Sequence, residues 1–261
     1  MSELLLILGV AGAAAIASPL GGLIALWHKP TTLFMSVAVG FASGVLLGTI
    51  AFEMLPQALE LASLAISIAG FVIGFLTVYG FDLFIHRGRL SGEKAEQHEA
   101  VERFYRRHRP RGDEVTVLAG GTSAEELIEG LTIGVGAAIK PGLGLLVALA
   151  IVIDNLSEAL SIGEIIRSQQ KEGDRLAVWR ILKWTGLIGV SLFAAALVGW
   201  FALRGLPPPV LGFLFAVGGG GMFYITMTDL IPEAEERQYQ QSAALAIAAG
   251  FTVMLVLSRF L

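Results

Sequence analysis

Two short stretches, EELIEG and DNLSEA, place acidic side chains one helical turn apart inside otherwise apolar sequence. Carboxylates four residues apart share one face of a helix, so each stretch presents a pair of oxygen ligands in the same direction. All-oxygen sites suit divalent cations of the Mg²⁺, Ca²⁺ and Mn²⁺ type, with Fe²⁺ next and Zn²⁺ preferring nitrogen or sulfur. The pairs are Glu125 with Glu129 and Asp154 with Glu158, and Asn155, Ser161 and Thr132 add neutral oxygens close by.

The rest of the chain is apolar enough to lie within a lipid bilayer. Its 261 residues are 55% hydrophobic and 15% charged, whereas soluble domains carry about 25% charged residues. Apolar runs of roughly 20 residues indicate transmembrane helices. The sequence therefore predicts an all-α integral membrane protein with one transmembrane domain, 1–261. Its eight helices are expected at about 3–26, 32–55, 62–85, 117–139, 142–166, 180–203, 209–231 and 241–260.

Basic residues predict how the helices are oriented in the membrane. All of the 18 Lys and Arg residues except Lys140, Arg204 and Arg259 fall in or beside the odd-numbered connections. Connections rich in Lys and Arg face the cytoplasm in multi-pass proteins. The odd-numbered connections are therefore expected to be cytoplasmic, which predicts a cell (inner) membrane protein with both termini outside. The longest connection, residues 86–116, is then a cytoplasmic loop between helices 3 and 4. Its three His residues are simpler to interpret as scattered exposed side chains than as a metal site.

The acidic pairs lie near the middle of helices 4 and 5, where a charge is costly. An ionised carboxylate in the membrane core costs several kcal/mol, and no Lys or Arg lies at a matching depth to pair with it. The site must therefore hold protons, or bind a cation on which several carboxylates converge. Facing helices that each supply carboxylates are a known way to build a divalent-metal site. Protonated carboxyls bonded to one another are the alternative, but five acidic residues on adjacent helices favour a functional site.

Two weak internal repeats suggest an inverted architecture. EELIEGLTIG in helix 4 aligns with DNLSEALSIG in helix 5, and FEMLPQA in helix 2 aligns with TDLIPEA in helix 7. The second alignment pairs Glu53 with Asp229 and Pro56 with Pro232. Each pair of helices runs in opposite directions, which is typical of transporters built as inverted repeats around a central site. The expected arrangement is three helices, two helices and three helices.

The chain resembles the ZIP (Zrt/Irt-like protein) family of divalent-metal transporters over most of its length. The resemblance rests on the eight helices, the long third loop, and the segments GVLLGTIAFEMLPQA and GGMFYITMTDLIPEA. It rests also on helix 4, where H-N-x-P-E-G becomes EELIEG. In helix 5, H-E-x-P-E-G or Q-D-x-P-E-G becomes DNLSEA. The resemblance implies a paired metal site between helices 4 and 5, and its six candidate ligands are Glu125, Glu126, Glu129, Asp154, Asn155 and Glu158.

Several motif positions depart from the family pattern. The motif histidines are replaced by Glu125 and Asp154, and both prolines are replaced, by Ile128 and Ser157. A proline frees a backbone carbonyl one turn earlier for coordination, so here those carbonyls are expected to stay in the helix. Ala159 replaces the glycine of helix 5, which slightly reduces close helix approach.

The resemblance also implies a route, a partner and a mode of action. Asp82 and Asp229 are expected to pass metal out on the cytoplasmic side, while Glu53 could belong to the entrance. Family members are often homodimers that move metal into the cytoplasm by sliding one helix bundle against the other. The expected partners are therefore divalent cations, the lipid bilayer and a second copy. No enzyme activity and no cofactor beyond the transported metal are expected.

Other functions remain as alternatives at this stage. A proton-coupled carrier of a small organic solute would need a roomy apolar pocket with a counter-charge for its solute. An integral-membrane phosphatase is disfavoured because no central Arg exists to hold a diphosphate. A net charge of −4 is too small to suggest a nucleic-acid partner. The absence of Cys excludes disulfides and thiolate metal sites.

Ligand type yields a prediction about metal selectivity. Compared with a His-bearing relative, this protein should discriminate less in favour of Zn²⁺ and accept Mn²⁺ or Fe²⁺ more readily. Changing Glu125 and Asp154 together to His restores imidazole at both motif starts and should move selectivity towards Zn²⁺. Competition transport assays on the parent and the double variant measure this. A parent that carries Zn²⁺ and rejects Mn²⁺ even without a competitor would show that ligand type does not set selectivity.

Overall fold

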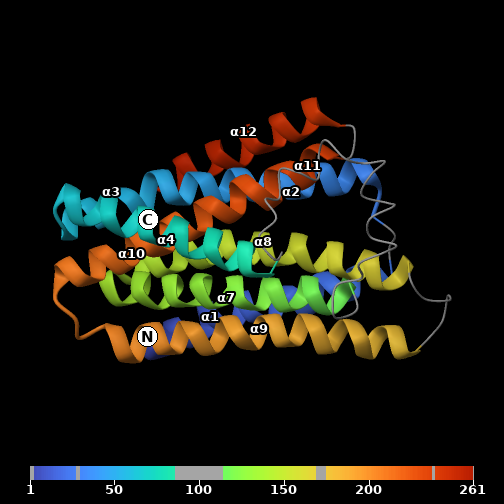
Figure 1. Ribbon diagram of the computed structural model, residues 1–261, viewed down its shortest axis with the longest axis horizontal. Helices are drawn as coiled ribbons and strands as arrows, with labels where there is room; N and C mark the ends of the chain where they lie inside the picture. The colour runs from blue at the N-terminus through green and yellow to red at the C-terminus, as the bar shows by residue number, and fades with distance from the viewer. Residues whose placement is uncertain (1–2, 28–29, 86–113, 169–174, 237–238, 261) are drawn as a thin grey trace.

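The computed structural model describes residues 3–27, 30–85, 114–168, 175–236 and 239–260 (Figure 1). These residues form helices and the turns that connect them, and no strand occurs in the ranges just given. Most of the predicted cytoplasmic loop, residues 86–113, lies outside the described residues. The following helix begins at Glu114, so the last three residues of the predicted loop, 114–116, are helical.

The helices coincide closely with the predicted transmembrane segments. Their bounds are α1 Glu3–Trp27, α2 Thr32–Thr49, η1 Ile50–Met54, α3 Leu55–Leu61, α4 Leu64–Ile85, α7 Glu114–Ile139, α8 Pro141–Ser168, α9 Arg175–Leu203, α10 Pro208–Ile225, η2 Thr226–Leu230, α11 Ile231–Glu236 and α12 Gln240–Leu257. Two of the predicted segments are composite helices, because a single π-helical turn (η1 or η2) joins α2 to α3 and α10 to α11.

The outer surface of the helices suits a lipid environment. In the described part of the chain, seven continuous helical segments are long and apolar enough to cross a membrane. Helix α7, with 26 residues, has comparable length but carries the acidic residues of the first motif. Large apolar side chains such as Val190 (66% exposed) and Leu245 (73% exposed) point outwards. Soluble proteins rarely expose apolar surface so extensively, which confirms a multi-pass membrane protein.

The helices divide into two bundles (Figure 1). The α8 bundle contains α1, α7, α8 and α9, in which α1 packs on α8 and α9, and α7 packs on α9. The α10 bundle contains α2–α3, α4, α10–α11 and α12, in which α2 packs on α12 and α10 packs on α4. The bundles meet where α2 lies against α8 and α10 lies against α7. The bundle that holds both acidic motifs is thus distinct from the bundle that holds both composite helices.

The packing pattern has the expected internal symmetry. Exchanging α1 with α9, α8 with α7, α2 with α10 and α4 with α12 reproduces the same set of helix contacts. The composite helices agree in detail, because each π turn ends two residues before Pro56 or Pro232. A proline donates no backbone hydrogen bond and clashes with the carbonyl four residues earlier, so the helix widens there. The inverted 3+2+3 arrangement is confirmed.

The two ends of the molecule differ. Helix α1 begins, α12 ends and the α7–α8 turn lies at one end, here called the termini end (Figure 1). Helix α4 ends, and α7 begins, at the other, here called the loop end. The basic residues predict that the loop end faces the cytoplasm, and this orientation stays a prediction.

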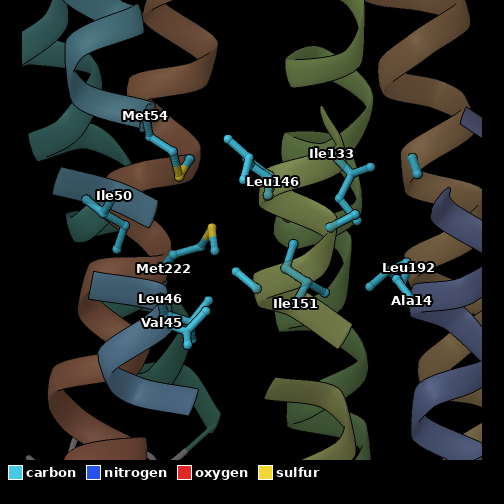
Figure 2. Close-up of a cluster of buried hydrophobic side chains, with 14 of the residues drawn as sticks. Ala14, Val45, Leu46, Ile50, Met54, Ile133, Leu146, Ile151, Leu192 and Met222 are labelled. Carbon is cyan, nitrogen blue, oxygen red and sulfur yellow. The ribbon is translucent and has the colours of Figure 1, made fainter. Parts of the chain in front are cut away.

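Apolar side chains fill the contact between the bundles (Figure 2). Leu46, Met54 and Met222 of the α10 bundle face Leu146 and Ile151 of α8, and all five are 0–1% exposed. Methionine side chains are flexible and adapt to different neighbours. The contact therefore contains few directional bonds that would oppose sliding of one bundle along the other.

Within each bundle, glycines bring helix backbones into direct contact. A Cβ at Gly74 of α4 would overlap the carbonyl of Val217 in α10, and one at Gly44 of α2 would overlap that of Ile247 in α12. Small residues allow such close packing, which holds transmembrane helices together by van der Waals contact. Each bundle is thereby a close-packed unit.

Substitution of Gly74 tests this packing. Gly74→Ala should destabilise the protein by about 1–3 kcal/mol, because overpacking forces the helices apart. Gly80→Ala is the matched control in the same helix, since a Cβ there meets nothing within 4 Å. Thermal unfolding of the purified protein in detergent measures both. Equal apparent melting temperatures for the two variants would contradict a backbone contact at Gly74.

Candidate functional site

The two acidic motifs lie on a helical hairpin formed by α7 and α8. The turn is closed by the backbone N–H groups of Leu143 and Gly144, which donate to the carbonyl of Lys140 at 3.0 and 3.2 Å. Gly144 also packs directly against the backbone of Ala137, so the helices start close together. Because a helix rises about 1.5 Å per residue, Glu129 lies about 15 Å from this turn and Asp154 about 20 Å. Both motifs are therefore near the middle of their helices.

Most of the candidate ligands are removed from solvent and lipid. Asp154 and Glu126 are 1% exposed, Glu129 is 3% exposed, and Asn155 is fully buried. Glu125 and Glu158 are half-buried. Helix pairing thus places all six on the inner side of the fold, as the helix-face argument requires.

Side chains of the two motifs contact each other across the hairpin. The Asn155 amide Nδ2 donates to Glu126 Oε2 at 3.3 Å, and to the carbonyl of Ala14 in α1 at 3.5 Å. The carboxyls of Glu129 and Asp154 also lie close enough to interact with each other. The structure therefore brings together the residues that the sequence alone could only assign to adjacent helices.

Several oxygens in this cluster have no hydrogen-bond partner. In the described part of the chain, six buried side-chain atoms are unpaired: Ser18 Oγ, Glu126 Oε1, Glu129 Oε2, Asp154 Oδ1, Asn155 Oδ1 and Trp200 Nε1. Four of the six belong to the candidate ligands, and all four are acceptors. Each buried unsatisfied group costs about 1–3 kcal/mol, so this concentration calls for a positively charged or proton-donating ligand.

The charges around the cluster are all of one sign. Glu158 interacts electrostatically with Asp154, Glu125 and Glu129, and Glu129 with Glu126. Across the described residues, the charges that act on the five acidic ligands are those of other carboxyls. A divalent cation would relieve this repulsion and satisfy the unpaired oxygens together.

The carboxylates lie along the α7–α8 hairpin but do not converge on one position where a metal ion would be coordinated. Within the ranges that the structure describes, no three acidic or His side chains are already gathered in metal-binding geometry. Glutamate side chains have three rotatable bonds, and half-buried Glu125 and Glu158 have room to turn. Coordination of a cation therefore requires rotation of side chains already placed on the right helix faces.

The predicted exit residues lie close to the first motif. Asp82 of α4 and Asp229 of η2 both interact electrostatically with Glu125. The phenol of Tyr224 donates a 2.7 Å hydrogen bond to Asp82 Oδ2, and so links α10 to α4. Asp82 and Asp229 therefore place carboxylates of the α10 bundle beside the first motif of the α8 bundle.

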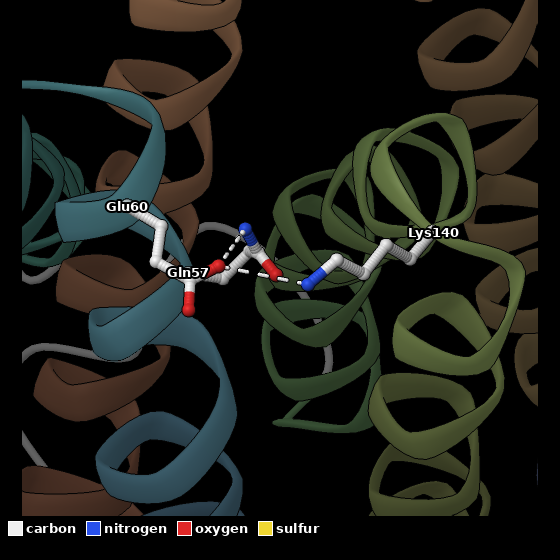
Figure 3. A network of polar contacts seen from close by, with 3 residues as sticks. All are labelled: Gln57, Glu60 and Lys140. Atoms are coloured by element: carbon white, nitrogen blue, oxygen red, sulfur yellow. Dashed lines mark hydrogen bonds and ion pairs between the residues drawn. The ribbon is translucent and has the colours of Figure 1, made fainter.

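The predicted entrance residue lies towards the termini end. Glu53 of η1 is half-buried and interacts with Lys140 in the α7–α8 turn. Lys140 also forms a 3.5 Å ion pair with Glu60 of α3, so it links the two bundles at this end (Figure 3).

The departures from the motif have local structural consequences. Helices α7 and α8 continue unbroken through Ile128 and Ser157, so their carbonyls stay within the helices as predicted. Thr132 Oγ1 and Ser157 Oγ each donate to the carbonyl four residues earlier, at 2.7 and 3.1 Å. Close approach near Ala159 is provided by the partner helix, because a Cβ at Gly21 of α1 would lie 2.5 Å from the carbonyl of Leu156.

Two polar residues near the site were not among the predicted ligands. Ser18 of α1 is fully buried, and it lies on the same helix face as Ala14, which contacts Asn155. Glu233 of α11 interacts with Asp154 and Glu158. The only sequence signal for Glu233 was its position one turn after Asp229, and nothing in the sequence distinguished Ser18.

Comparisons with known proteins identify the family of the chain. Residues 88–258 match a family model described as ZIP Zinc transporter. A zinc transporter ZupT of Escherichia fergusonii is 26% identical over 259 residues, covering 97% of this chain and 95% of the relative. A zinc transporter ZupT of Corynebacterium efficiens is 29% identical over 254 residues, covering 93% and 92%. The family match covers more than half of the chain and includes both acidic motifs, so this protein belongs to the ZIP family of divalent-metal transporters.

Proposed function

We propose that the protein moves divalent cations of the Zn²⁺, Mn²⁺ or Fe²⁺ class into the cytoplasm through the carboxylate cluster between α7 and α8. As a member of a transporter family it is not an enzyme. It acts in the cell (inner) membrane as a homodimer, and needs no cofactor beyond the cation that it carries.

The observation that carries this proposal is the set of unpaired buried oxygens. Glu126, Glu129, Asp154 and Asn155 each hold one acceptor atom without a partner, and all four lie on one hairpin. A bound cation would satisfy these atoms at once. Mixed carboxylate and amide oxygens provide the hard ligands that Mn²⁺ accepts, and they do not exclude Zn²⁺ or Fe²⁺.

The arrangement of the bundles supports a transport mechanism. The cluster belongs to the α8 bundle, while Glu53, Asp82 and Asp229 belong to the α10 bundle. Sliding of the α8 bundle along the apolar contact would carry the bound cation from Glu53 near the termini end towards the aspartates. In this scheme Glu53 serves the entrance, and Asp82 and Asp229 serve the exit.

The two glutamates that both motifs share should be the most sensitive positions. Glu129→Gln and Glu158→Gln keep the side-chain shape but remove a charged ligand. Each should lower the initial rate of Zn²⁺ uptake into proteoliposomes by about tenfold or more, since loss of even a partner of a metal ligand costs about 10–100-fold. Glu235→Gln, at an exposed carboxylate of α11, is the control. If both variants insert, fold and transport like the parent, the central site is assigned wrongly.

Metal binding should depend on pH. Carboxylates must lose their protons before they coordinate a cation, so binding releases protons and should weaken as pH falls. Isothermal titration of the detergent-solubilised protein with Zn²⁺, in two buffers that differ in ionisation enthalpy, measures the affinity and the protons released. Equal affinity without proton release between mildly acidic and neutral pH would argue against coordination by the carboxylates.

A further inference from the structure

A short hydrogen bond joins the two bundles on the loop side of the cluster. The hydroxyl of Ser161 in α8 donates to Glu233 Oε1 in α11 at 2.6 Å, in a partly buried position. The segment that carries Glu233 is held against α2 by a second bond of 2.6 Å, from Ser36 Oγ to the carbonyl of Ala234. The Glu233 carboxylate is therefore fixed within the α10 bundle but faces the α8 bundle.

Glu233 faces the part of α8 that carries metal ligands. Its carboxylate interacts electrostatically with Asp154 and Glu158. Asp154 is 1% exposed, and its Oδ1 atom has no hydrogen-bond partner. An unpaired buried acceptor that lies near a second carboxylate of like charge favours a cation shared between them.

The position of Ser161 shows on which side of the cluster Glu233 lies. Asp154, Glu158 and Ser161 follow one another at four and three residues, so they share one face of α8. Ser161 lies about 4.5 Å further along the helix axis than Glu158, in the direction of the loop end. Glu233 is thus a carboxylate on the loop side of the metal ligands that α8 carries.

The inverted repeat shows that this carboxylate has no charged counterpart. The alignment that pairs Pro56 with Pro232 pairs Gln57 with Glu233. Gln57 is neutral, and its Nε2 donates to Glu60 at 3.1 Å, which in turn pairs with Lys140 (Figure 3). The termini end therefore has an amide and a lysine where the loop end has a carboxylate.

We propose that Glu233 is a further metal-binding residue on the loop side of the site, and that Ser161 is the positioning residue that holds its carboxylate towards Asp154 and Glu158. The proposal rests on the proposed metal transport. It adds Glu233 to Asp82 and Asp229 as residues of the α10 bundle that receive the cation from the α8 bundle, and it makes the route chemically different at its two ends.

Transport by charge-removing variants is the first test. The full chain is reconstituted in proteoliposomes, and Zn²⁺ uptake is measured for the parent, Glu129→Gln, Glu233→Gln and the exposed control Glu235→Gln. Glu233→Gln should lose about tenfold or more of the initial rate, while Glu235→Gln keeps the parent rate. Parent-like uptake by Glu233→Gln, with loss in Glu129→Gln, would overturn the role of Glu233 and leave the central site intact. No uptake by the parent would overturn both.

A selectivity measurement separates a metal ligand from a structural link between bundles. Glu233→His replaces an oxygen ligand with an imidazole, which Zn²⁺ prefers more strongly than Mn²⁺ does. The ratio of Zn²⁺ to Mn²⁺ uptake should therefore rise several-fold over that of the parent. A lower rate for both metals at an unchanged ratio would show that Glu233 only holds the bundles together, and would overturn the proposal.

The positioning role of Ser161 has its own control on the same helix. Ser161→Ala should reduce uptake by on the order of tenfold, and Ser161→Thr should restore it by returning the hydroxyl. Ser157→Ala, one turn earlier, should keep the parent rate, because that hydroxyl donates to the carbonyl of Ile153 in its own helix. Equal rates for Ser161→Ala and Ser157→Ala would overturn the positioning role.

Discussion

A carboxylate that is removed from water must find hydrogen-bond donors, a proton or a cation, and this protein buries several of them together. Glu126, Glu129 and Asp154 are at most 3% exposed, and the charges that act on them come from other carboxyls. Their mutual repulsion and unpaired oxygens are costly in an apolar surrounding. A bound cation or bound protons would offset that cost, and a cation fits the family of metal transporters to which the chain belongs.

Close packing of helix backbones holds each bundle together. Glycines such as Gly44, Gly74 and Gly130 bring helix backbones together within a bundle, where added side-chain atoms would overlap a neighbouring carbonyl. The contact between the bundles contains instead many flexible and branched apolar side chains, including Met54 and Met222. Each bundle is thus a close-packed unit, and few polar contacts join the two. This arrangement supports the proposed sliding of one bundle along the other.

The internal symmetry has exceptions that make the two ends of the molecule chemically different. Both repeats place a π turn before a proline, and both place an acidic residue within it, Glu53 or Asp229. The neighbouring positions differ, because one repeat has Gln57 and the other has Glu233. Lys140 adds a cation near Glu53, at the termini end. The structure thus has a lysine near one end and an additional carboxylate near the other, although its framework is nearly two-fold.

The sequence by itself predicted the all-α membrane fold, the apolar segments that the structure shows as helices, and the acidic residues that lie together on the α7–α8 hairpin. These features are local, since an apolar run of membrane length and a four-residue spacing of carboxylates are visible in the chain. Only the tertiary structure decided which side chains meet, such as Asn155 with Glu126 and Ser161 with Glu233. Each depends on how helices are rotated about their axes, and one extra residue in a π turn changes that rotation by about 100°. No periodicity in the sequence records where such a turn falls.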